Sequence, residues 1–276
     1  MIKNNSDMNG LTSEQKRRYN RHIILDGFGM EAQRQLIGSK VLIVGAGGLG
    51  SPASMYLAAA GVGTIALMDG DFVSLTNLQR QVLYNTADVG RFKIDVAEER
   101  LKAMNPDINI IKHATYLNED NALDIIKDYD FVVEGTDNFA SKYLVNDACV
   151  MLGKGFTIGG INRFGGQVMT HLQGTACYRC LFPEPPAIAE VETCSMVGVL
   201  GPLAGMVGTV QATEAIKCLA GIGEPLTNSF LTVDALTMSW QRFDFSKDNN
   251  CKLCGNKPSI TTLKEYAYKP CAKRNK

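Results

Sequence analysis

A glycine-rich loop at residues 45–51 is the first part of the sequence whose residue types could do chemistry. Gly45, Gly47 and Gly50 fit the pattern G-x-G-x-x-G, and the apolar run at 41–44 before them predicts a buried strand. Glycines let backbone N–H groups at a helix N-terminus reach phosphate oxygens, because no Cβ intervenes. We therefore predict a nucleotide-phosphate site rather than a simple tight turn. The pattern alone does not separate ATP from a nicotinamide cofactor.

A carboxylate follows at the spacing that such a site requires. Asp69 comes directly after the next predicted strand, residues 64–68, and about 20 residues beyond the loop. There it can accept hydrogen bonds from ribose hydroxyls. The order of strand, glycine turn, helix, strand and carboxylate predicts a nucleotide-binding βαβ unit.

Two cations and an amide come after this second strand. Taken singly, Arg80 and Lys93 could be solvated surface charges, but with Asn77 they follow a phosphate loop. Hydride transfer to nicotinamide needs less positive charge than this. A triphosphate cleaved between its α- and β-phosphates does need it, because fixed cations stabilise the charge that builds on the leaving pyrophosphate.

Asp137 and Asn138 follow a third predicted strand, residues 131–134. Open α/β sheets bind their ligands at the carboxyl ends of such strands. Asp137 could hold Mg²⁺ through one oxygen while phosphates and waters complete the octahedron. An N-cap of the helix beginning near Phe139 is the alternative role for either residue, and the two roles can coexist.

Two C-x-x-C pairs predict a metal site. Thiolates at this spacing can share a tetrahedral Zn²⁺, and the separation of the pairs by about 70 residues favours a closed structural clamp over a compact finger. A redox role is the alternative. The four predicted ligands are Cys177, Cys180, Cys251 and Cys254.

The other cysteines differ in their surroundings. Cys149 and Cys218 lie in apolar helical patterns and are expected to be small core residues, and Cys271 lies in a basic tail. Cys194 lies in a loop before a helix whose N-terminus could lower its thiol pKa. It is either a nucleophile or a bystander.

Alternating strands and helices must position these residues. We predict an α/β fold with a Rossmann-like, mostly parallel sheet, extended after residue 166 by antiparallel strands. The predicted strands are 41–44, 64–68, 109–113, 131–134, 156–158, 167–172, 230–233 and 238–243, and the predicted helices are 31–36, 52–60, 122–127, 139–152 and a glycine-broken helix ending at 221.

The organisation is expected to be simple. Thr12 and Gln15 fit a capping box, which predicts a short helix in an N-terminal helical arm, residues 11–37, with no obvious buried face. No linker or repeat divides the chain, so residues 11–260 are predicted to form a single domain followed by a tail, residues 261–276.

Composition excludes several classes of protein. The 276 residues are 45% hydrophobic and carry 28 basic and 28 acidic side chains, so no net field favours nucleic acid or an anionic membrane. The polar N-terminus is no signal peptide, and the longest apolar run, 197–210, is too short for a bilayer. We therefore expect a cytoplasmic protein whose cysteines are thiols or metal ligands.

Taken together, these motifs resemble the ThiF/MoeB/HesA family of ubiquitin-activating-type adenylyltransferases. The resemblance runs in order from about Leu11 to Gly255. It rests on the segments 18–22, 45–51, 69–71, 77–81, 136–138 and 214–217, on Lys93 and on the two cysteine pairs.

The resemblance implies a homodimer that binds ATP, Mg²⁺ and a small ubiquitin-like sulfur-carrier protein ending in Gly-Gly. The carrier carboxylate would attack the α-phosphate, releasing pyrophosphate and leaving an acyl-adenylate that sulfur later displaces. This activity would serve thiamine or molybdopterin biosynthesis. The chain has no room for an appended rhodanese domain, so the sulfur would come from another protein, such as a cysteine desulfurase.

The resemblance also implies roles for single residues. Gly48 and Asp69 would contact the nucleotide, with Asp71 and Asn138 in the same motifs. Asn77, Arg80 and Lys93 would contact the phosphates and Asp137 the Mg²⁺. Arg21 would reach the neighbouring subunit's triphosphate. The four paired cysteines would hold structural zinc, and Cys194 falls where thiamine-branch members keep a cysteine that can join the carrier.

Two other functions fit parts of the sequence. The glycine pattern also fits an NAD-dependent oxidoreductase of Rossmann type. The third hypothesis is that the protein is a binding scaffold without catalytic activity, stabilised by zinc.

Overall fold

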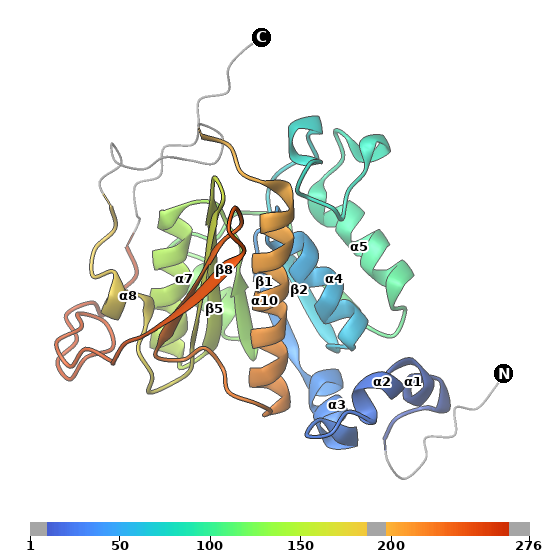
Figure 1. Cartoon of the computed structure of the whole chain (residues 1–276), viewed down its shortest axis with the longest axis horizontal. Helices are drawn as coiled ribbons and strands as arrows, with labels where there is room; N and C mark the ends of the chain where they lie inside the picture. The colour runs from blue at the N-terminus through green and yellow to red at the C-terminus, as the bar shows by residue number, and fades with distance from the viewer. Residues whose placement is uncertain (1–9, 187–196, 265–276) are drawn as a thin grey trace.

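A single eight-stranded sheet organises the protein (Figure 1). The computed structural model describes residues 10–186 and 197–264. The strand order is β3-β2-β1-β4-β5-β6-β7-β8; the first five strands in this order pair in parallel and the remaining pairs are antiparallel. The predicted mostly parallel sheet with antiparallel additions is confirmed. The strands are β1 (Lys40–Val44), β2 (Thr64–Met68), β3 (Asn109–His113), β4 (Phe131–Glu134), β5 (Gly155–Asn162), β6 (Gly165–His171), β7 (Ser229–Asp234) and β8 (Ser239–Asp244).

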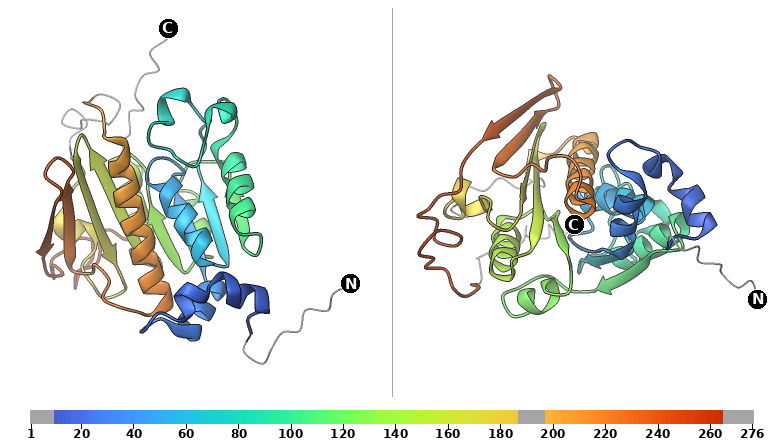
Figure 2. Two further views of the ribbon diagram at one scale, coloured as in Figure 1. Left: turned by 45° about the vertical axis from the view of Figure 1, so that its right-hand side comes forward. Right: turned by 90° about the horizontal axis from the view of Figure 1, so that it is seen from below.

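Helices cover both faces of the sheet (Figure 2). Side chains alternate along β1: Val41 and Ile43 pack with the helices of one layer, and Leu42 and Val44 with those of the other. This explains why a strand buried on both faces is apolar at every one of these positions. The first layer contains α3 (Gly29–Gly38), α4 (Gly50–Ala60), α5 (Lys93–Met104) and α10 (Gly201–Ala220), and the second contains α6 (Ala122–Ile126) and α7 (Phe139–Leu152).

Two predicted elements differ from those in the structure. The strand predicted at 156–158 extends to Asn162, since its outer half pairs with β6. The helix ending at residue 221 is not broken by its glycines: α10 runs without interruption for 20 residues. Gly208 has a packing role there, because a Cβ would lie 2.5 Å from the carbonyl oxygen of Leu49. Gly208 therefore lets α10 approach the glycine loop closely, and the glycines do not end the helix.

The N-terminal arm docks at the amino-terminal edge of the sheet. Its first helix, α1 (Ser13–Arg18), has the predicted capping box and no buried residue of its own. The residues flanking it are buried instead. Tyr19 is 3% exposed, its hydroxyl accepts a hydrogen bond from Asn105 Nδ2, and its ring lies where a Cβ on Gly61 would be. Figure 1 shows α1 to α3 at one end of the molecule and the segment between β2 and α5 at the other.

No described helix has both the length and the apolar character needed to cross a membrane.

Candidate active site and cysteine cluster

A cavity of about 140 Å³ lies where β1, β2 and β4 end. The carboxyl ends of parallel strands meet at one edge of a sheet, so the residues that follow these strands come together. Nine of the residues predicted for the site line this cavity: Gly45, Gly47, Gly48, Asp69, Asp71, Arg80, Lys93, Asp137 and Asn138.

The glycine loop forms one wall through a tight turn. Gly45 has φ +91°, a left-handed conformation that favours glycine. A Cβ on Gly50 would lie 1.9 Å from the carbonyl oxygen of Gly45. Gly50 does not line the cavity; its role is to let the start of α4 approach the end of β1. Gly45 therefore shapes the turn, Gly45 and Gly47 line the cavity, and Gly50 permits the packing.

Asp69 holds this loop in place. Its Oδ2 accepts a hydrogen bond from the backbone N–H of Ala46 at 2.9 Å, and its Oδ1 accepts one from Asp71 N–H at 2.8 Å. Burial raises the pKa of the Asp69 carboxyl, while Lys93, 3.8 Å away, opposes that shift. A carboxylate has further lone pairs, so these contacts leave acceptor capacity for ribose hydroxyls.

Lys93 is buried beside two carboxylates. Its side chain is 5% exposed, and its Nζ lies 2.9 Å from Asp71 Oδ2. The other Asp71 oxygen accepts a hydrogen bond of 2.6 Å from the hydroxyl of Tyr116, which also lines the cavity. Tyr116 was not predicted from the sequence. Its position just after β3, at the same sheet edge, is the signal that could have identified it.

Asp137 and Asn138 divide the two roles that the sequence left open. The Asn138 side chain caps α7, accepting a hydrogen bond of 2.8 Å from Ser141 N–H. Asp137 is exposed and lines the cavity. The helix therefore does not need the Asp137 carboxylate, which remains accessible to a cation or ligand.

Other predicted residues lie outside the cavity. Asn77 ends a short 3₁₀ turn, and its carbonyl oxygen accepts the backbone N–H groups of Arg80 and Gln81, so it shapes the segment that carries Arg80. Arg21 lies on α2 (Asn20–Ile23), in the arm at the opposite edge of the sheet. Cys194 lies outside the described residues.

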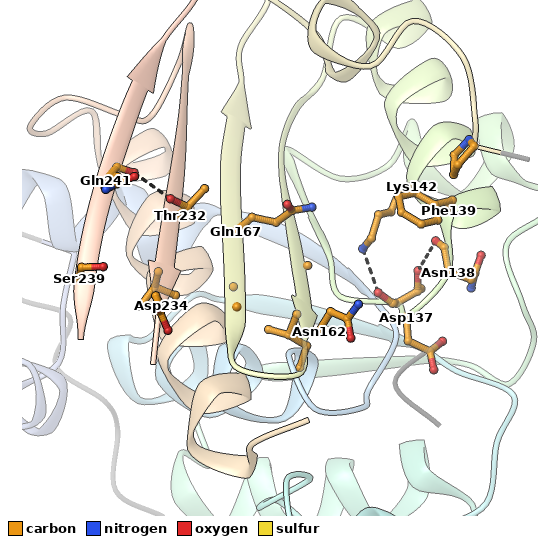
Figure 3. A pocket seen from close by; sticks show the side chains of 17 residues that line it. Asp137, Asn138, Phe139, Lys142, Asn162, Gln167, Thr232, Asp234, Ser239 and Gln241 are labelled. Atoms are coloured by element: carbon orange, nitrogen blue, oxygen red, sulfur yellow. Dashed lines mark hydrogen bonds between the residues drawn. The ribbon is translucent and has the colours of Figure 1, made fainter. Parts of the chain in front are cut away.

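A larger groove of about 780 Å³ adjoins the cavity (Figure 3). The two share Thr136, Asp137, Asn138 and Ile161. From there the groove crosses the antiparallel half of the sheet to β8. Val168 and Val233 pack in a cluster with residues of α10, so their neighbours in sequence face the other side, where the groove lies. Its polar lining comes from Asn162, Gln167, Thr232, Asp234, Ser239 and Gln241.

Sequence motifs did not identify this groove. Its polar side chains come from four strands, and each strand contributes one or two residues. The period-2 alternation of β7 and β8 was the available signal, but it does not tell which face is hollow.

The four predicted cysteines form one cluster. Their Sγ atoms all lie within 4.8 Å of one another, with Cys177 and Cys251 at 3.7 Å and Cys180 and Cys254 at 3.4 Å. Sulfurs bound tetrahedrally at about 2.3 Å would lie roughly 3.8 Å apart, so the cluster can hold a metal ion. The backbone N–H of Asp248 also lies 3.4 Å from Cys180 Sγ, as a donor to that sulfur.

Helix α7 supports the first cysteine pair. Asn146 Oδ1 accepts the backbone N–H of Tyr178, and Asp147 accepts two hydrogen bonds from Arg179 at 2.8 and 2.9 Å. These bonds fix the turn between Cys177 and Cys180. Of the remaining cysteines, Cys149 is buried as predicted.

Known proteins resemble this chain over most of its length. The sequence model described as the ThiF family matches residues 19–253. The sulfur carrier protein adenylyltransferase of Thermus thermophilus is 44% identical over 261 residues, covering 92% of this chain and 96% of that protein. The probable adenylyltransferase/sulfurtransferase MoeZ of Mycobacterium tuberculosis is also 44% identical over 93% of this chain, which spans 65% of the length of MoeZ.

A solved structure that contains ATP has a similar fold. The crystal structure of E. coli MccB with ATP has a TM-score of 0.78 and 26% identity, covering 88% of this chain and 75% of MccB. None of these three proteins is named as an oxidoreductase, so the nicotinamide alternative is not favoured.

Proposed function

The chain belongs to the ThiF family, and from that premise we propose that it is an ATP-dependent adenylyltransferase. Its second substrate is the C-terminal glycine of a small ubiquitin-like sulfur-carrier protein. The carrier carboxylate attacks the α-phosphorus of ATP, the bond to the β-phosphate oxygen breaks, and pyrophosphate leaves with the bonding electrons. The products are an acyl-adenylate and pyrophosphate.

One observation carries this proposal: the cavity that holds the glycine loop, Arg80 and Lys93 opens into the groove at Asp137. A nucleotide in the cavity and an extended peptide in the groove would meet at Thr136–Asn138. There the terminal carboxylate would lie next to the phosphates. Proximity of this kind removes much of the entropic cost of bringing two substrates together.

The charges in the cavity support a requirement for Mg²⁺. Asp69, Asp71 and Asp137 carry three negative charges against the two positive charges of Arg80 and Lys93. A triphosphate entering alone would be repelled by this excess. Mg²⁺ held by Asp137 and by phosphate oxygens would remove the repulsion, and it would stabilise the charge that develops on pyrophosphate.

Arg80 and Lys93 would act on the leaving group. Lys93 is buried and oriented by Asp71, so its ammonium needs little reorganisation when the phosphates bind. Arg80 is half-buried against Gly48, next to the glycine loop.

We further propose that the enzyme is a homodimer in which Arg21 acts on the partner's nucleotide. Arg21 lies at the opposite edge of the sheet from its own chain's cavity. The apolar side chains of Ile24 and Leu25 beside it are 62% and 57% exposed, as expected of a surface that another chain covers.

Mixing two inactive variants tests the dimer. Arg21→Ala and Asp137→Ala are each expected to be inactive as pure dimers. In a mixed dimer one site carries both defects and the other carries neither, so activity should reappear. No recovery in mixed dimers would reject the action of Arg21 across subunits.

The cysteine cluster is proposed to hold structural Zn²⁺. Four sulfur ligands leave no open coordination position, which is typical of structural rather than catalytic zinc. The sulfur that displaces AMP is proposed to come from a separate protein, such as a cysteine desulfurase. Cys194 as a thiol that joins the carrier stays a prediction, and so does the choice between thiamine and molybdopterin biosynthesis.

The test of the main proposal is ATP–pyrophosphate exchange with Mg²⁺ and candidate carriers ending in Gly-Gly. Exchange should depend on the carrier and vanish when its last glycine is removed. Absence of exchange with every such carrier would reject the function. Tight NAD(H) binding that ATP does not compete for would restore the oxidoreductase alternative.

A further inference from the structure

A buried ion pair lies directly beneath the point where the cavity and the groove meet. Glu134 is the last residue of β4, and Lys142 lies in the first turns of α7. Their side chains are 0% and 6% exposed, and Lys142 Nζ lies 2.6 Å from Glu134 Oε2. The motifs of the sequence identify neither residue.

All three hydrogens of the Lys142 ammonium have acceptors in the protein. Besides Glu134, they are donated to the carbonyl oxygens of Thr136 at 2.9 Å and Gly159 at 2.6 Å. An ammonium has three donors, so none remains for a substrate. Any effect of Lys142 on the reaction must therefore act through the residues that it holds.

Those residues connect the two binding regions. Thr136 immediately precedes Asp137, and Gly159 immediately precedes Gly160 and Ile161, which line the groove. Figure 3 shows the Lys142 side chain reaching from α7 to the loop that carries Asp137. One ammonium thus fixes this loop against strand β5.

Glu134 fixes the other side of the same loop. Its Oε1 accepts hydrogen bonds from the backbone N–H of Thr136, at 2.9 Å, and from the Thr136 hydroxyl. Its backbone carbonyl oxygen accepts a bond of 2.7 Å from Gln211 Nε2 on α10. The pair therefore joins β4, β5, α7 and α10 around the loop.

Stability alone does not explain such a pair. Desolvating two charges is costly, and well-packed apolar residues often stabilise a core as well or better. The same helix carries a second buried pair, Asp147 with Arg179, which lines neither the cavity nor the groove. That pair is a natural control.

We propose that Lys142, fixed by Glu134, is a positioning residue that holds the Asp137 loop at a set distance from strand β5. In this way it aligns the metal-binding carboxylate with the peptide substrate in the groove. The proposal rests on the function proposed above and deepens it. Mutation of the residues that orient metal ligands commonly lowers metal affinity or activity by about 10- to 100-fold.

The experiment measures carrier-dependent ATP–pyrophosphate exchange as a function of Mg²⁺ concentration. Lys142→Met and Glu134→Gln are each expected to raise the Mg²⁺ concentration for half-maximal rate by about tenfold or more and to lower the maximal rate. Asp147→Asn, an equally buried neutralisation on the same helix, should leave the Mg²⁺ requirement unchanged. Glu134→Gln is isosteric, so it carries the test if Lys142→Met does not fold.

The double variant separates position from charge. Glu134→Gln combined with Lys142→Met restores charge balance but not the ammonium bonds to the carbonyl oxygens of Thr136 and Gly159, so its Mg²⁺ requirement should stay high. Recovery to the wild-type requirement would overturn the proposal, as would a wild-type requirement in both single variants or an equal shift in Asp147→Asn. If the wild-type protein shows no exchange with any carrier, the proposed function fails instead.

Discussion

The two cations of the cavity are held in different ways. Lys93 is buried in a fixed position between Asp69 and Asp71. Arg80 is half-buried, and one guanidinium nitrogen donates to the carbonyl oxygen of Thr76 at 3.3 Å. Because a single long hydrogen bond restrains it weakly, Arg80 can turn towards the phosphates when they bind. Lys93 is thus a preset cation and Arg80 an adjustable one.

Removing the adjustable cation should impair the chemical step. Arg80→Ala is expected to lower the rate of carrier-dependent pyrophosphate exchange by about 10²- to 10³-fold, the usual loss when a donor to developing charge is removed. Its melting temperature should stay near that of the wild type, because the side chain is half-buried. Lys127→Ala, which removes an exposed cation on α6, is the control. Equal rates in the two variants would contradict the role of Arg80.

Alanine at two different glycine positions is expected to have opposite effects on stability, because the surroundings of the two glycines differ. Gly50→Ala places a Cβ 1.9 Å from the Gly45 carbonyl oxygen, so it should lower the free energy of unfolding by about 1–3 kcal/mol or more. It should also weaken ATP binding, since the loop must shift. Gly205→Ala in α10 meets no atom within 4 Å and should stabilise by up to about 1 kcal/mol. Denaturant unfolding and nucleotide titration measure both effects.

At the scale of elements, the parallel half of the sheet supplies the nucleotide cavity and the antiparallel half supplies the groove. Helix α10 joins them. Its Gly208 lies against the glycine loop, and its Gln211 donates to the backbone of β4. Helix α7 acts on the other face, where its first turns fix the Asp137 loop and its middle supports the cysteine cluster. A disturbance of α10 should therefore reach the glycine loop and β4, whereas a disturbance of the first turns of α7 should reach the Asp137 loop.

A contact between the end of β3 and the turn before β4 also creates a pH-dependent contribution to stability. His113, at the end of β3, shares a hydrogen bond of 2.8 Å with the Tyr129 hydroxyl, and burial lowers its pKa. The folded protein therefore keeps this imidazole neutral below the pH at which the unfolded chain, with a pKa of about 6.5, binds a proton. The stability is fully present above about pH 6.5 and is lost as the pH falls towards the lowered folded pKa.

His113→Gln tests this dependence, because glutamine can keep the hydrogen bond but does not titrate. The unfolding free energy of the wild type should decline more steeply than that of the variant as the pH is lowered from about 7.5 to 5. Tyr129→Phe should keep the wild-type slope, since burial and not the hydroxyl lowers the pKa. Parallel profiles for the wild type and His113→Gln would refute the assignment.

At the scale of the whole molecule, the cysteine cluster links segments about 70 residues apart. The first pair follows β6 and the second follows β8, so a bound metal ion would close a loop that contains α10 and the β7–β8 hairpin. The hairpin forms the outer wall of the groove. The metal would therefore stabilise the surface on which the carrier is proposed to lie.

Removing one sulfur ligand should weaken both metal binding and the stability of the β7–β8 hairpin. Cys254→Ser is expected to lose bound zinc and, for a loss of about 3 kcal/mol, to melt roughly 6–12 °C lower. Backbone amides of β7 and β8 should exchange with solvent faster, while those of β1 and β2 change little. Cys218→Ala is the control and should keep its metal content. A zinc content unchanged in Cys254→Ser would reject the four-cysteine site.

Features that depend on neighbours along the chain could be predicted from the amino-acid sequence. The Gly45–Gly50 spacing, Asp69 after its strand and the C-x-x-C pairs were identified because a turn, a strand end or a knuckle is set by a few adjacent residues. The sheet class follows from the alternation of strands and helices along the chain.

Features that join distant segments of the chain became visible only in the folded protein. The groove is assembled from four strands, the Glu134–Lys142 pair reaches Gly159 on the neighbouring strand β5, and Arg21 lies far from its own chain's cavity. Gly208 resembles a helix break in the sequence, because the sequence does not show that Leu49 and Pro52 pack against it. Local propensity is set by a few residues, whereas a cavity, a buried ion pair or a close helix contact depends on which distant surfaces meet.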